Sequence, residues 1–213
     1  RRREHFSAHT VTPEQLLAAM DGAGVDAVLA VTLPIYGVSN AYALRAAALA
    51  PQRIGVVGLI DPESPDLDAR VRDWRATPGM LALRVPLYID SEVESVRHGP
   101  MRRVLVAAER HNVPVCVYPP GRLAEVEALA RDFPDLQLIV DHIGLAQPPV
   151  ICDLSRQPFK GLDGLLRLAG CRNVAVKATG APAAWKTRAM ASVPGGVVFA
   201  AGPSASTPLS PAS

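Results

Sequence analysis

The stretch LQLIVDHIG, residues 136–144, places a short apolar run directly before an aspartate and a histidine. An apolar run of this length is typical of a strand that is buried in a parallel sheet. Side chains at the carboxyl end of such a strand lie at the mouth of the sheet, where α/β folds keep their reactive groups. The stretch therefore predicts an α/β fold with His142 at its functional edge.

Similar apolar runs recur along the chain and alternate with helical patterns. They predict strands over residues 25–32, 54–60, 81–87, 113–118, 136–142, 174–179 and, as the least regular of them, 197–200. Apolar residues at helical spacing predict helices over residues 101–111 and 123–133, and Thr12 and Gln15 form the capping-box pattern that begins another helix. Strand–helix units that recur at roughly 30 residues predict parallel strands joined by crossovers.

Six or seven such strands fit either an open doubly wound sheet or a (β/α)8 barrel. No glycine-rich phosphate loop follows any of the runs, which disfavours a nucleotide-binding sheet. Because the first recognisable element is a helix, a strand that should precede it is absent or hidden in residues 1–10. We expect one domain over residues 1–185. The only charged residues in the sequence from 186 to 213 are Lys186 and Arg188. This segment is predicted to be an aberrant, disordered tail.

Composition narrows the class of protein further. The chain has 213 residues, of which 49% are hydrophobic, and this is enough for one domain with a core. A net charge of +2 gives no reason to expect a nucleic-acid partner, and no apolar run approaches the ~18 residues of a membrane span. Three cysteines without a CxxC pair (Cys116, Cys152 and Cys171) predict reduced thiols and a cytoplasmic location.

Alternation along the predicted strands separates an apolar face from a mixed face. In one strand the apolar face carries Leu81, Leu83, Val85 and Leu87, and valines take the same position in two other strands. These faces suit a helix layer. The mixed faces suit a barrel interior, which would bring together the four residues Arg84, Tyr118, Lys177 and His142.

Two cations with a phenol and an imidazole suit a small carboxylated molecule. The Arg84 guanidinium can bind a carboxylate through two hydrogen bonds, and the His142 imidazole can transfer protons near neutral pH. Structural roles stay open for each residue: Arg84 could pair with an aspartate (Asp141 or Asp61), Lys177 could reach solvent, and Tyr118 and Cys116 could be packing residues. No HxH, HExxH or Cys/His cluster is present, so no metal site and no cofactor are predicted.

Several stretches of the chain together resemble the amidohydrolase-related (amidohydrolase 2) family. The resemblance covers about residues 6–185 and rests on TPEQLLAAMDGAGV (12–25), YGVSN (36–40), RIGVVGLIDP (53–62), LRV (83–85), FPDLQLIVDHIG (133–144) and VKATG (176–180). The most similar branch is that of the TIM barrels related to 2-pyrone-4,6-dicarboxylate lactonase and to aminocarboxymuconate-semialdehyde decarboxylase.

The resemblance implies a (β/α)8, TIM-barrel-like fold that is incomplete, with its first strand missing and its last strand degenerate, in one barrel domain over residues 1–185. It also implies a hydrolase of a small carboxylated lactone or amide. His142 would be its active-site histidine, Arg84 would hold the substrate, and Tyr36 and Asn40 would line the mouth of the barrel. Tyr118 and Lys177, from the mixed strand faces, complete the predicted substrate site.

The sequence departs from the family pattern at three points, and two of them, the absent His-x-His strand and the absent aspartate, lead us to expect impaired turnover. The family opens with a His-x-His strand, which this sequence does not contain. Metal-binding members carry a histidine where this chain has Tyr118, which favours the lactonase branch, understood to work without that metal. In residues 198–203, Gly202 stands where the family has an essential aspartate.

Other functions stay open at this point. A decarboxylase or lyase of the same superfamily is one alternative. Lys177 as a Schiff-base nucleophile is a second, and a non-catalytic binding module or degenerate fragment is a third.

Overall fold

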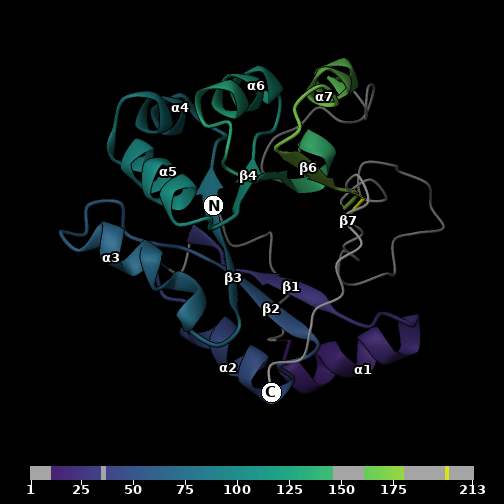
Figure 1. Ribbon diagram of the computed structural model, residues 1–213. Coiled ribbons are helices and arrows are strands. Elements are labelled where there is room, and N and C mark those ends of the chain that lie inside the picture. Colours follow the sequence, from purple (N-terminus) through teal and green to yellow (C-terminus); the bar gives the residue numbers. More distant parts are fainter. Residues whose placement is uncertain (1–10, 35–36, 146–160, 180–199, 202–213) are drawn as a thin grey trace.

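The described part of the chain forms one seven-stranded sheet that is covered by helices. The computed structural model describes residues 11–34, 37–145, 161–179 and 200–201 (Figure 1). In order across the sheet, the strands are β1 (Val28–Val31), β2 (Ile54–Gly58), β3 (Met80–Pro86), β4 (Val115–Tyr118), β5 (Leu138–Val140), β6 (Val174–Lys177) and β7 (Ala200–Ala201). The first six run parallel and form a half-barrel, so the prediction of an incomplete TIM-barrel-like fold is confirmed.

Helices alternate with the strands, as the recurring strand–helix pattern predicts. They are α1 (Pro13–Ala23), α2 (Ala41–Leu49), α3 (Leu67–Arg72), α4 (Asp90–Arg97), α5 (Pro100–Arg110), α6 (Leu123–Asp132) and α7 (Leu162–Leu168), with short 3-10 turns at η3 (Trp74–Ala76) and η4 (Asp141–Gly144). In the view of Figure 1, α1 and α2 lie at the bottom, α3 lies at the left, and α4, α6 and α7 lie at the top. None of the described helices is long and apolar enough to cross a membrane.

The first helix begins where the sequence predicts. The Thr12 side chain accepts a hydrogen bond from the Gln15 amide at 3.3 Å, and the Gln15 side chain accepts one from the Thr12 amide at 2.9 Å. This reciprocal pair satisfies two amides that the first turn would otherwise leave without partners. Gly24 ends the helix with a φ of 65°, a left-handed conformation that glycine adopts without strain.

The two faces of the sheet differ as alternation predicts. Leu83, Val85 and Leu87 are fully buried in the main core together with apolar residues of the helices. The opposite, inner face carries a smaller cluster of Val57, Ala82 and Cys116. This part of the inner face is therefore apolar.

The assignment of Leu81 to the apolar, helix-facing side of its strand is wrong. The register between β2 and β3 shifts between Val56 and Val57, so that Met80 rather than Leu81 joins the main core. Leu81 is 44% exposed, and its Cδ1 atom occupies the space that a Cβ atom at position 55 would need. A bulge turns every residue before it to the other face, which alternation alone does not reveal.

The last strand also differs from the expectation of an all-parallel sheet. Ala200 and Ala201 pair antiparallel with Lys177 and Val176. A parallel return needs a crossover connection that is usually a helix, and the sequence between these strands has no helical pattern. Apart from these two alanines, the predicted tail at residues 186–213 lies outside the described residues, and the division at residue 185 stays a prediction.

Candidate functional site

A buried carboxylate lies between two cations at the carboxyl ends of β3, β5 and β6. The Arg84 Nη1 atom donates to Asp141 Oδ2 at 3.2 Å, and the Lys177 Nζ atom lies 2.7 Å from Asp141 Oδ1. Arg84 is 6% exposed, and Asp141 and Lys177 are each 2% exposed. Strand register explains the meeting: Val140 pairs with Val176, and the residues that follow these two valines form the second ion pair.

This cluster holds more positive than negative charge. Two cations share one carboxylate, and the Arg84 Nε atom is buried without a hydrogen-bond partner in the described part of the chain. Buried polar groups are nearly always satisfied, and a buried charge normally has a counter-ion. The arrangement is therefore complementary to an anion.

Cys116 lies on the inner face of the sheet, in the row that contains Arg84. It is fully buried, and this burial raises the pKa of the Cys116 thiol to about 11. A thiol with such a pKa is neutral near pH 7 and is a poor nucleophile. The packing role that the sequence left open for Cys116 fits this environment.

His142 lies in a left-handed turn directly after β5. The φ angles are 55° at His142, 49° at Ile143 and 70° at Gly144. Such angles are unusual for any residue other than glycine, and a β-branched isoleucine is a clear outlier. Strained backbone of this kind persists where the surrounding structure fixes it, and it is common at functional sites.

The imidazole of His142 is held by two neighbours. Its Nδ1 atom lies 2.9 Å from Thr179 Oγ1, and its ring meets the Tyr118 ring edge-on at 5.3 Å. Burial lowers the pKa of His142, and the Arg84 and Lys177 cations lower it further, while Asp141 acts in the opposite direction. A neutral imidazole at pH 7 follows from this environment.

Aromatic rings line one side of the cluster. The Arg84 guanidinium lies 5.9 Å from the centre of the Tyr118 ring, within the range of a cation–π interaction. The Tyr88 and Tyr118 rings are 5.6 Å apart. Tyr118 therefore contacts the cation and the imidazole of the site at once.

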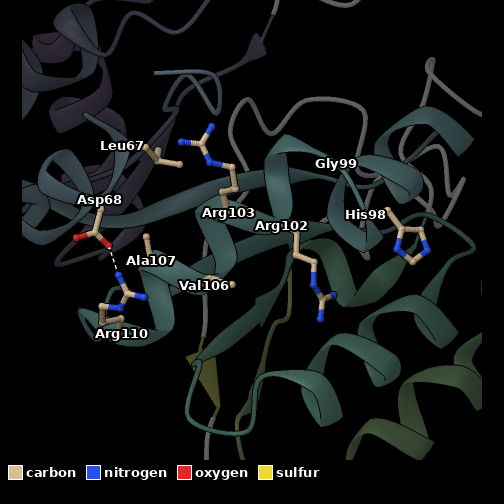
Figure 2. A pocket seen from close by; sticks show the side chains of 9 residues that line it. All are labelled: Leu67, Asp68, His98, Gly99, Arg102, Arg103, Val106, Ala107 and Arg110. Atoms are coloured by element: carbon tan, nitrogen blue, oxygen red, sulfur yellow. Dashed lines mark hydrogen bonds and ion pairs between the residues drawn. The ribbon is translucent and has the colours of Figure 1, made fainter. Parts of the chain in front are cut away.

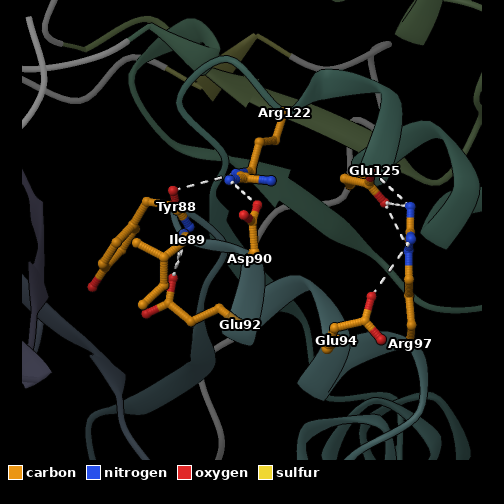
Figure 3. Close-up of polar contacts among 8 residues, drawn as sticks. All are labelled: Tyr88, Ile89, Asp90, Glu92, Glu94, Arg97, Arg122 and Glu125. Atoms are coloured by element: carbon orange, nitrogen blue, oxygen red, sulfur yellow. Dashed lines mark hydrogen bonds and ion pairs between the residues drawn. The ribbon is translucent and has the colours of Figure 1, made fainter.

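Polar contacts fix the rim of the site, where the loops after β3 and β4 meet (Figure 3). Arg122 donates to the Tyr88 carbonyl at 3.2 Å and pairs with Asp90 at 2.7 Å. Arg97 and Glu125 join α4 to α6 through charged hydrogen bonds of 2.6–3.1 Å. These contacts hold Tyr88 beside the site.

The structure brings together four of the six predicted site residues: Arg84, Tyr118, His142 and Lys177. Asn40 is engaged elsewhere, because its side-chain amide donates to the Leu59 carbonyl and accepts from the Leu59 amide. Tyr36 lies outside the described residues. Lys177 does not reach solvent, and Arg84 pairs with Asp141, which was one of the two partners considered for it.

Two members of the cluster had no predicted function. Asp141 was considered only as a structural partner of Arg84, although it links both cations. Thr179 was only placed on the mixed face of its strand. In the sequence, only their positions could have indicated that these two residues belong to the site: Asp141 directly precedes His142, and Thr179 follows Lys177 by two residues.

The described residues do not fit a bound metal ion. No three His, Cys, Asp or Glu side chains among them converge as ligands. Asp141, the buried carboxylate beside His142, already faces two cations that would repel a divalent ion.

A surface groove of about 450 Å³ lies away from this cluster, between α3 and α5 (Figure 2). Arginines line it, but they have partners: Arg110 pairs with Asp68 at 2.7 Å, and Arg102 pairs with Asp132 at 3.2 Å. Arg103 reaches the Pro62 carbonyl at 3.4 Å. The groove shares no residue with the carboxyl ends of the strands.

Comparisons with known proteins agree with this fold. The profile of a family described as Amidohydrolase matches residues 1–203. A probable 2-pyrone-4,6-dicarboxylic acid hydrolase from Acinetobacter baumannii, crystallised with citric acid, is similar at a TM-score of 0.66 and 15% identity over 84% of this chain and 64% of that chain. An amidohydrolase from Burkholderia multivorans with bound HEPES is similar at a TM-score of 0.64 and 22% identity, over 80% of this chain and 60% of that chain.

A third solved structure is that of 5-carboxyvanillate decarboxylase from Sphingomonas paucimobilis. It is similar at a TM-score of 0.51 and 16% identity over 76% of this chain and 63% of that chain. The chain thus spans less than two thirds of the length of these solved relatives. No curated protein matches the sequence.

Proposed function

Because this chain belongs to the amidohydrolase family, we propose that the cluster around Asp141 binds a small carboxylated lactone or amide. The excess positive charge of the buried cluster carries this proposal. A ligand carboxylate would supply the missing counter-charge and an acceptor for the buried Arg84 Nε atom. The citrate in the Acinetobacter structure, a small carboxylate bound to a protein of similar fold, supports the same ligand class.

The reaction that we propose is hydrolysis at the carbonyl group of the bound ligand. Water adds to the carbonyl carbon and loses a proton to solvent, negative charge develops on the carbonyl oxygen, and the ring C–O or the C–N bond then breaks as the leaving oxygen or nitrogen takes up a proton from solvent. Arg84 would hold a carboxylate of the ligand, and His142 would stabilise the developing oxyanion. Tyr118 would pack against the ring of the ligand.

We propose that turnover by this chain is slow. Attack by water requires a base, and Asp141 is the only carboxylate that the described residues place in the cluster. Arg84 contacts one of its oxygens and Lys177 contacts the other, so neither oxygen is free to accept a proton from water. A binding protein without catalysis, one of the alternatives from the sequence, differs from this proposal only in the absence of any turnover.

The test uses 2-pyrone-4,6-dicarboxylate, the compound named in the Acinetobacter relative. Binding is measured by calorimetry, and ring opening is followed by the loss of the pyrone absorbance. We expect binding that falls at least tenfold in Arg84→Met and is unchanged in Arg103→Met, a control in the groove of Figure 2. The neutral dimethyl ester should bind much more weakly.

Two results would contradict the proposal. Equal affinity for the diacid and the ester would remove the role of the charged cluster. Fast ring opening by the wild type, at a rate that drops in His142→Ala, would show that the described residues catalyse hydrolysis without a further base. Release of CO2 from 5-carboxyvanillate would instead favour the decarboxylase alternative, which the Sphingomonas fold similarity raises.

A further inference from the structure

The imidazole of His142 has a fixed partner that belongs to no predicted site. Thr179 follows β6 by two residues, is 4% exposed, and places its Oγ1 atom 2.9 Å from His142 Nδ1. The other ring nitrogen, Nε2, is then the one available to a ligand. Which nitrogen carries the proton decides whether His142 donates or accepts at that position.

Counting protons resolves the direction of this hydrogen bond. The Thr179 hydroxyl has one proton, and within the described residues its only side-chain partner is His142 Nδ1. If the hydroxyl only accepted a bond from Nδ1–H, its own proton would be buried without an acceptor, which is unfavourable. If it donates to the Nδ1 lone pair, both atoms are satisfied and the ring proton resides on Nε2.

The charges around the ring agree with a neutral imidazole. Among the described residues, the charged groups that act on the ring are the Asp141 carboxylate and the Arg84 and Lys177 cations, and the Tyr118 ring lies edge-on to it at 5.3 Å. Burial is the main cause that lowers the pKa of His142; the two cations lower it as well, and Asp141 raises it.

We propose that Thr179 is a positioning residue whose hydroxyl donates to His142 Nδ1 and holds the imidazole as the neutral Nε2–H tautomer. His142 then meets a ligand as a hydrogen-bond donor to a carbonyl or carboxylate oxygen, not as a base. The effect on ligand binding rests on the proposed function, whereas the tautomer in the free protein does not.

The test reads the tautomer directly in the full chain. Protein with ¹⁵N-labelled histidine is examined by long-range ¹H–¹⁵N correlation NMR at neutral pH, and the His142 signals are assigned by their loss in His142→Gln. Thr179→Val keeps the shape of the side chain and removes the hydroxyl, and Thr179→Ser restores it. Circular dichroism confirms that each variant is folded.

We expect a protonated Nε2 and an unprotonated, hydrogen-bonded Nδ1 in the wild type and in Thr179→Ser. In Thr179→Val the Nδ1 resonance should move toward the protonated value, because nothing then excludes the other tautomer. Affinity for 2-pyrone-4,6-dicarboxylate should fall about fivefold in Thr179→Val, as expected for the loss of one orienting hydrogen bond, and should stay at the wild-type value in Thr179→Ser.

A proton on Nδ1 in the wild type would overturn the inference, and so would unchanged His142 resonances in Thr179→Val. If the NMR result is as expected but the wild type does not bind the dicarboxylate, the proposed function fails and the role of Thr179 stands.

Discussion

Replacing Asp141 by asparagine tests whether one carboxylate holds the buried cluster together. At an effective dielectric constant of about 20, Coulomb's law gives an attraction of roughly 5 kcal/mol for Arg84 at 3.2 Å and roughly 6 kcal/mol for Lys177 at 2.7 Å. The substitution also removes the cost of burying the carboxylate, which is several kcal/mol. We therefore expect Asp141→Asn to lower the free energy of unfolding by about 3–5 kcal/mol.

Urea denaturation followed by circular dichroism measures this loss. The matched control is Asp132→Asn, which breaks the half-exposed ion pair with Arg102 and should cost less than about 1 kcal/mol. Added citrate should rescue Asp141→Asn, because a bound anion can take the place of the lost carboxylate. At 100 times its Kd, citrate would restore about 2.7 kcal/mol.

A loss below about 1 kcal/mol, with no effect of citrate, would refute the view that Asp141 neutralises two buried cations.

Three further predictions concern single groups. Lys177 is buried and ion-paired with Asp141 at 2.7 Å, so borohydride with pyruvate should leave the mass of the protein unchanged; a reduced adduct at Lys177 would favour the Schiff-base alternative. Burial raises the pKa of Cys116 to about 11, so iodoacetamide near pH 8 should modify it only after unfolding in urea, as peptide mass spectrometry can show. The pKa of His142 is lowered from 6.5, so the unfolded chain binds more protons as the pH falls below that value; the stability advantage of the wild type over His142→Asn should shrink between about pH 7 and pH 5 in urea titrations.

Alternation along the strands was sufficient to predict most of the fold. It assigned Leu83, Val85 and Leu87 to the helix layer and Arg84 to the inner face, and the structure agrees. It failed at Leu81, because the run around it alternates without a break and the bulge depends on pairing with β2. Register between strands is a property of two segments, and one segment does not encode it.

The site was predictable only as far as strand ends define it. Parallel strands bring their carboxyl ends to one edge, which is why Arg84, Lys177 and His142 were expected to be neighbours. The left-handed turn that follows Asp141 was not predictable, because Ile143 gives no local signal for such a turn. The engagement of Asn40 with Leu59 likewise joins residues 19 positions apart.

The strand order couples the covering of a sheet edge to the charge of the cluster. Without β6, Arg84 and Asp141 would be matched one to one, and the edge of β5 would be open. The pairing of β6 with β5 covers that edge and brings Lys177 to Asp141, so the same contact that completes the parallel sheet adds the second positive charge.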